Sequence, residues 1–116
     1  MNVAEDPNVK AIIDEKRYTV AAFYQFVSLN NIKHLQAELK KLCQKYEIFG
    51  TILLAREGIN GTVSGSQSSV NSLFKWFDHQ PSFHDIQVKY SNSNSLAFNR
   101  LKVRIKKEIV TMGQPN

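Results

Sequence analysis

The chain has 116 residues with a net charge of +5, and 42% of its residues are hydrophobic and 22% charged, which suits one globular domain with a modest core. No stretch approaches the ~18 apolar residues that a membrane span requires, and the acidic N-terminus has no apolar core of a signal peptide. Cys43 is the sole cysteine, which excludes an internal disulfide and favours a cytoplasmic location.

The chain is predicted to begin with a polar leader over residues 1–16, followed by a folded domain over residues 17–112. Residues 18–28 are rich in aromatic, β-branched and other apolar side chains at both sets of alternating positions. This pattern predicts a strand that is covered on both faces, as in the centre of a sheet.

A helix is predicted next, with Asn30 or Asn31 as its N-cap. Its apolar residues recur at spacings of three and four, as in one buried stripe: Ile32, Leu35, Leu39, Leu42, Cys43 and Tyr46. Because Cys43 lies within this stripe, a core position is favoured for it over a role as nucleophile.

Residues 51–55 predict a second strand, residues 56–61 a turn, and residues 62–64 the start of a return strand. Asn60-Gly61 is a hairpin signal because both residues tolerate positive φ. Gly58 and Gly61 allow close approach of the backbone, Arg56 offers an anion-binding fork, and Glu57 and Asn60 add polar groups. This turn is a candidate contact for RNA or a neighbouring domain, although its spacing alone favours a plain hairpin loop.

Ser66 is predicted to cap a second helix, which ends before Pro81. Its inner face is formed by Val70, Leu73, Phe74 and Phe77, while Trp76 lies off this stripe. A strand over residues 85–90, a loop over 91–95 and a last strand near residues 100–106 follow. The resulting order, βαββαβ with one extra C-terminal strand, predicts an α+β, ferredoxin-like split βαβ sandwich. We expect an antiparallel sheet with two helices on one face.

The last strand carries most of the charge asymmetry. Residues 1–85 contain equal numbers of basic and acidic side chains, so the whole excess lies in residues 86–116. Four cations alternate with apolar residues there: Arg100, Lys102, Arg104 and Lys106. Side chains on one face of a strand recur every ~7 Å, close to the phosphate spacing of extended nucleic acid. Together with Lys89 and Arg56, these residues are the candidate nucleic-acid contacts, and the alternatives are edge protection and solubility.

No complete catalytic site is recognisable. His34, His79 and His84 do not form a metal-binding pattern, and there is no phosphate-binding glycine motif or nucleophile–base pair. We therefore assign no catalytic residue and no metal to this chain.

Three segments resemble a known family: residues 21–27 (AAFYQFV), residues 50–65 (GTILLAREGINGTVSG) and residues 98–110, which include FNRLKVR and KEIV. They look like the N-terminal domain of the tRNA uridine hydroxylases, rhodanese-domain proteins that make 5-hydroxyuridine at the wobble position of bacterial tRNA. The similarity spans about residues 18–113, and the EGINGT stretch is its most specific part.

This resemblance implies an acylphosphatase-like fold, tRNA as partner and molecular oxygen as co-substrate of the whole enzyme. It also implies that the catalytic cysteine lies in a rhodanese domain that follows, so residues 113–116 would begin the linker to it. The chain itself would bind and position tRNA without a cofactor of its own.

Three alternatives remain open from the sequence. A stand-alone acylphosphatase-like hydrolase would need an arginine in the loop after the first strand, where the chain has Ser28-Leu29-Asn30-Asn31. An RNA-recognition motif would need aromatic residues on two central strands, and only the first strand offers them, in Phe23, Tyr24 and Phe26. A structural or dimerising module would use an open sheet face.

Overall fold

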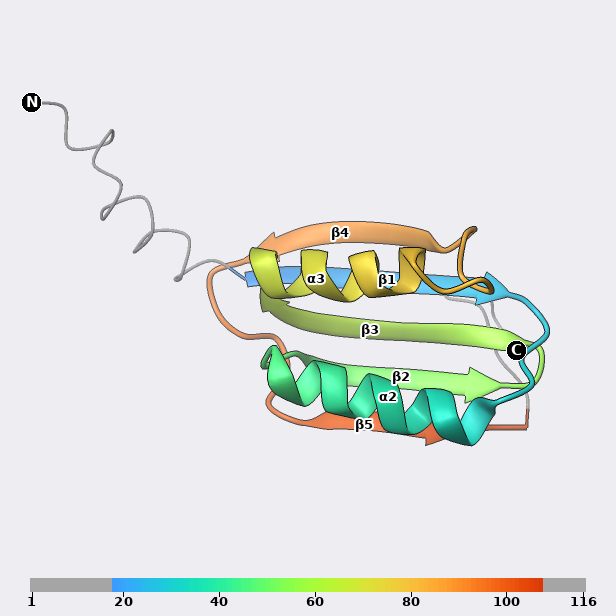
Figure 1. The fold of residues 1–116 in the computed structure, drawn as a ribbon. Helices are drawn as coiled ribbons and strands as arrows, with labels where there is room; N and C mark the ends of the chain where they lie inside the picture. Colours follow the sequence, from blue (N-terminus) through green and yellow to red (C-terminus); the bar gives the residue numbers. More distant parts are fainter. Residues whose placement is uncertain (1–17, 108–116) are drawn as a thin grey trace, which may run out of the picture.

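The computed structural model describes residues 18–107 (Figure 1). The elements follow in the order β1 (Tyr18–Phe26), α2 (Ile32–Lys45), β2 (Phe49–Ala55), β3 (Gly58–Ser66), α3 (Gln67–Asp78), β4 (Gln87–Ser93) and β5 (Leu101–Ile105). The predicted leader over residues 1–16 and the predicted linker over residues 113–116 lie outside the described residues.

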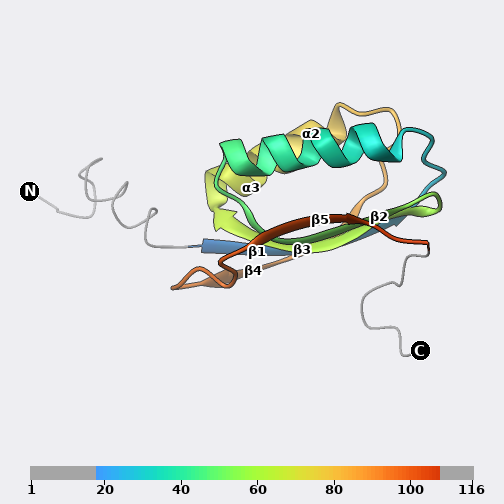
Figure 2. The same cartoon turned by 90° about the horizontal axis from the view of Figure 1, so that it is seen from below.

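The strands form one five-stranded sheet in the order β4-β1-β3-β2-β5. Both helices lie on the same face of this sheet, with α3 near β4 and β1 and α2 near β2 and β5 (Figures 1 and 2). The opposite face carries no helix, as the view in Figure 2 shows for the described residues. The ferredoxin-like α+β prediction is therefore confirmed, including the extra C-terminal strand.

The last strand corrects the expectation of an antiparallel sheet, because β5 pairs with β2 in parallel. The cause is the course of the chain after β4, which lies at the opposite edge of the sheet. Residues 94–100 cross the sheet at the end where β4 stops, so β5 must start at that same end (Figure 1). The sheet is therefore mixed, with four antiparallel strands and one parallel addition.

Strand β1 is central, as predicted, but only one of its faces is covered by helices. Thr19, Ala21, Phe23 and Gln25 are buried, whereas the alternate residues are half-buried and Phe26 is 58% exposed. The apolar side chains on the second face had suggested coverage on both sides. In the described part of the structure, that second face is the open face of the sheet.

The β2–β3 hairpin turns earlier than the Asn60-Gly61 pair predicted. Ala55 pairs with Gly58, so Arg56 and Glu57 form the turn, and Asn60 and Gly61 lie inside β3. A Cβ on Gly61 would lie 2.8 Å from the ring of Phe23. This glycine is therefore needed for packing rather than for chain reversal. A second boundary also differs, since β4 extends to Ser93 through part of the predicted 91–95 loop.

The helices pack on the sheet through the apolar stripes that the sequence predicted. Leu39 and Cys43 of α2 are buried, as are Val70, Leu73 and Phe77 of α3. The Ser66 side chain caps α3 by accepting a hydrogen bond from the Ser69 N–H at 3.1 Å. Asn31 occupies the N-cap position of α2, but its side chain makes no capping hydrogen bond.

Gly58 allows a test of whether the β2–β3 hairpin requires a residue without a side chain at this position. Its φ is +152°, and an added Cβ would lie 2.2 Å from the carbonyl oxygen of Gln25 on β1. We expect Gly58→Ala to lower the free energy of unfolding by about 1–3 kcal/mol, because both strain and overlap oppose the side chain. Denaturant titration would measure the loss. Gly65→Ala is the matched control, since its Cβ would meet the nearest atoms at 3.4 Å. Equal losses in the two variants would contradict this explanation.

Candidate nucleic-acid interface

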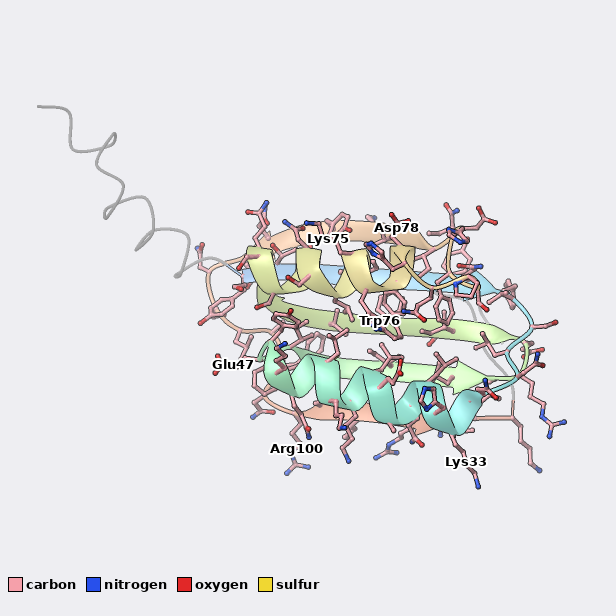
Figure 3. All side chains as sticks on the ribbon, in the orientation of Figure 1. Lys33, Glu47, Lys75, Trp76, Asp78 and Arg100 are labelled. Atoms are coloured by element: carbon pink, nitrogen blue, oxygen red, sulfur yellow. The ribbon has the colours of Figure 1, made fainter. Side chains whose placement is uncertain are left out.

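The cationic residues of the last strand lie at one edge of the sheet. Arg100, Lys102, Arg104 and Lys106 are all exposed. Val103 is only 8% exposed and belongs to the core beneath α2, so its neighbours Lys102 and Arg104 emerge on the open face. Figure 3 shows Arg100 extending outward from the β5 edge. Because β5 is an edge strand, these cations also oppose pairing with another sheet.

The strand register defines rows of side chains across the open face. Lys102 pairs with Thr51, which pairs with Thr62, then with Ala22, and finally with Lys89 on β4. Lys89 and Lys102 therefore stand in one row at opposite edges of the sheet. Four strand spacings of ~4.8 Å separate their backbones by about 19 Å. The structure does not bring Lys89 into the β5 cluster.

Arg56 lies at the other end of the strands from Arg100. The backbone of the hairpin turn accepts hydrogen bonds from the β1–α2 connection, with Val27 N–H on Glu57 and Leu29 N–H on Arg56, both at 2.9 Å. The Lys106 N–H bonds to Leu54 at 2.7 Å, so Lys106 reaches the same end of β2. Arg56 is exposed, so it places a further cation at the corner of the sheet where β2 ends, next to the cations of β5.

The polar residues of the predicted turn motif do not form one anion-binding loop. Glu57 is exposed in the turn, whereas Asn60 is 7% exposed on β3 and its row neighbours are Tyr24 and Leu53. Gly58 and Gly61 permit close approach of other protein groups, because a Cβ added at either position would overlap a neighbouring strand. In this structure the glycines of the motif serve the packing of the sheet.

The distribution of acids strengthens the positive character of the sheet. Within the described residues, none of the five strands contains an Asp or Glu. The acidic residues of this part lie on α2, on α3 or in connections: Glu38, Glu47, Glu57, Asp78 and Asp85. A surface with cations at both edges and no acid between them attracts polyanions over several ångströms.

The sequence did not reveal a cavity of about 220 Å³ on the open face. It is lined by Thr51, Leu53, Asn60, Gly61, Thr62 and Phe98. Phe98 comes from the connection that crosses the sheet between β4 and β5. The family-like segment FNRLKVR begins at Phe98, but only the strand order places this residue beside β2 and β3.

Another cavity of about 250 Å³ occupies the position where an acylphosphatase-like enzyme would bind phosphate, beside the loop after β1. Its polar lining includes Asn30, Asn31, Ser82 and a His34–Glu38 pair at 2.8 Å. Within residues 18–107, none of its lining residues is an arginine or lysine. An anionic acyl phosphate would therefore meet no guanidinium or ammonium group there, and one carboxylate.

Cys43 is in the core, as its place in the helical stripe predicted. It is fully buried, and burial raises the pKa of its thiol to about 12, so the nucleophilic thiolate is scarce near neutral pH. Trp76 lies on the side of α3 toward α2 (Figure 3) and packs on Phe77 with ring centroids 5.3 Å apart, which makes it part of the core edge. Across residues 18–107 there is no cluster of three or more His, Cys, Asp or Glu that could hold a metal.

Comparison with protein families gives a direct assignment. The family described as the UPF0176 acylphosphatase-like domain matches residues 18–109. The chain belongs to this family. The match covers all seven described elements, so the UPF0176 domain is the unit whose geometry is given above.

Curated relatives of the UPF0176 domain carry a functional name. The protein of Bartonella bacilliformis named tRNA uridine(34) hydroxylase is 48% identical over 99 residues, which cover 85% of this chain and 32% of the relative. A protein of the same name from Rhizobium leguminosarum is 44% identical over 96 residues, covering 83% of this chain and 31% of the relative. The chain thus spans about a third of the length of these relatives, and the family resemblance seen in the sequence is confirmed.

The similarity to solved structures supports the fold assignment only. The BLUF protein BlrP1 superposes with a TM-score of 0.59 at 17% identity, covering 77% of this chain and 64% of that chain. An acylphosphatase from Coxiella burnetii gives a TM-score of 0.52 at 8% identity, covering 80% of this chain and 96% of that chain. Among the described residues, no helix combines the length and apolar character needed to cross a bilayer.

Proposed function

We propose that this UPF0176 domain binds and positions tRNA for hydroxylation of the wobble uridine to 5-hydroxyuridine. The observation that supports this most is the identity of 44–48% to proteins named tRNA uridine(34) hydroxylase. The cationic edge strand supports a direct RNA contact, because Arg and Lys at alternate strand positions can bind successive phosphates. The domain would act in the cytoplasm, where tRNA is available.

The hydroxylation chemistry belongs, in this proposal, to a following rhodanese domain that supplies the catalytic cysteine and uses molecular oxygen. Two observations support this division of roles between the domains. The relatives are about three times as long as the matched region. The one cysteine here is buried with a raised pKa, so it is a poor nucleophile.

Binding of tRNA by the 116-residue chain tests this role. We expect an unmodified tRNA with uridine at position 34 to bind at ~50 mM salt and to dissociate progressively toward ~200 mM, because phosphate contacts release counterions. Fluorescence anisotropy of labelled tRNA would measure both affinities. Absence of binding at the lower salt would contradict the proposal. Turnover of an acyl phosphate by the same sample would instead revive the hydrolase alternative, which the cation-free cavity argues against.

A further inference from the structure

We propose that the cavity on the open face binds one unpaired nucleotide of the RNA, with its base against the ring of Phe98 and a phosphate on Lys102 or Arg104. This inference rests on the proposed RNA-binding function and specifies its substrate class as single-stranded RNA. The site is composed of residues from β2, β3, β5 and the crossing connection.

The position of Phe98 is the first support. The connection over residues 94–100 spans a sheet about 19 Å wide and bends along its course, beginning with a turn in which the Ser93 hydroxyl donates to the Ser95 carbonyl at 2.7 Å. Its course from β4 to β5 takes Phe98 past β3 and β2. Phe98 is half-buried and forms the aromatic wall of the cavity above Thr51 and Thr62.

The size and lining of the cavity are the second support. At about 220 Å³ it is smaller than the roughly 300–1,000 Å³ of ordinary small-molecule pockets, so it suits one flat ring system. Leu53 and Phe98 provide apolar surface, while Thr51, Asn60 and Thr62 provide polar groups on the floor. Aromatic walls with a few polar groups bind bases by stacking and hydrogen bonds.

The neighbouring charges are the third support, and they indicate which occupant fits. Lys102 is the register partner of Thr51, and Arg104 is the partner of Leu53, so both cations stand one strand away from the cavity floor. They emerge on the same face as the cavity, and none of the five strands in the described part of the chain contributes an acid. An aromatic wall beside two cations complements a nucleotide, whose base is flat and whose phosphate is anionic. A neutral protein surface would leave these cations unpaired.

This site differs from the base-stacking surface of an RNA-recognition motif. There, aromatic residues on the two central strands hold the bases. Here Phe23 is fully buried in the core, Tyr24 and Phe26 place aromatic rings on the open face of β1 alone, and β3 contains no aromatic residue. The ring comes instead from a connection at the β2–β3 side of the sheet, adjacent to the cationic strand.

Substitutions of Phe98 test the site with a single-stranded oligouridine and a blunt RNA duplex as probes. We expect Phe98→Ala and Phe98→Leu to weaken oligouridine binding about 5- to 150-fold, because one stacked base is lost. Phe98→Tyr should restore affinity, since the ring returns. Duplex binding should change less than about twofold, and the salt dependence of oligouridine binding should stay the same, because stacking releases no counterions.

Tyr90→Ala is the matched control. Tyr90 is 50% exposed, but it pairs with Ala21 and contacts Phe74 on the helix side of the sheet. Its loss should leave oligouridine affinity within about twofold, and circular dichroism melting would confirm that each variant is folded. If the Phe98 variants bind oligouridine like the unaltered chain, the nucleotide site is wrong, whereas the tRNA-binding role stands as long as the unaltered chain binds tRNA. Equal loss for duplex and oligouridine in Phe98→Ala would also overturn the site, because it would indicate general disruption.

Discussion

Replacing Arg100, Lys102 and Arg104 together with glutamine is expected to weaken tRNA binding roughly 100- to 500-fold at ~0.1 M salt. Each phosphate contact adds about 0.7–0.9 to the slope of log affinity against log salt concentration, so three contacts add about two to three. Because ~0.1 M is one decade below 1 M salt, this slope corresponds to about two to three logarithmic units of affinity. All three side chains are exposed on or beside β5, so their loss removes little packing. Equilibrium binding of labelled tRNA would measure the change.

The matched control removes the same charge from the helix side. Lys40, Lys41 and Lys45 are exposed on α2, and replacing them with glutamine lowers the net charge by the same amount. We expect this control to weaken binding less than about tenfold, through the change in long-range field alone. Similar losses in the two triple variants would show that net charge, rather than the β5 edge, governs binding.

Phe23→Ala is expected to lower the free energy of unfolding by about 3–5 kcal/mol, the usual loss for a large aromatic residue in a core. Phe23 is fully buried, and its ring lies 5.4 Å from that of Phe74 and 5.6 Å from that of Phe77. It also packs on the bare backbone of Gly61, so truncation opens a cavity between β3 and α3. Because domains of this size are stabilised by only ~5–15 kcal/mol, the variant should be close to unfolding at 37 °C.

Phe26→Ala on the same strand is the control for Phe23. Phe26 is 58% exposed on the open face, so we expect its removal to change the unfolding free energy by less than about 1 kcal/mol. Urea titrations of both variants would give the comparison. A loss at Phe26 as large as that at Phe23 would mean that the open face is a second core, contrary to the layer arrangement in Figure 2.

Local patterns were enough to predict most of the fold. The helical stripes, the Ser66 cap and the alternation in the last strand depend on neighbours within a few residues. The structure confirms the stripes and the cap, and it confirms the alternation from Leu101 to Arg104, whereas Ile105 is 40% exposed. The hairpin was predicted, but its turn was displaced to Arg56 and Glu57. A glycine that accommodates the Phe23 ring has the same sequence appearance as a glycine in a turn, and only the tertiary packing separates the two.

The candidate site was predictable only in part. The period of two along residues 100–106 identified the cations and their exposure, because both follow from strand geometry. The separation of Lys89 from this cluster and the approach of Phe98 to Thr51 depend on the order β4-β1-β3-β2-β5. That order is set by long-range pairing, which leaves no periodic signal in the chain.

The salt dependence of tRNA affinity tests the central proposal most directly. The logarithm of the dissociation constant would be measured against the logarithm of salt concentration, from ~50 to ~200 mM, for the unaltered chain and the Arg100, Lys102 and Arg104 triple variant. A β5 edge that contacts phosphates predicts that the slope decreases by about two to three units in the variant. Identical slopes would contradict the assignment of this strand as the tRNA contact.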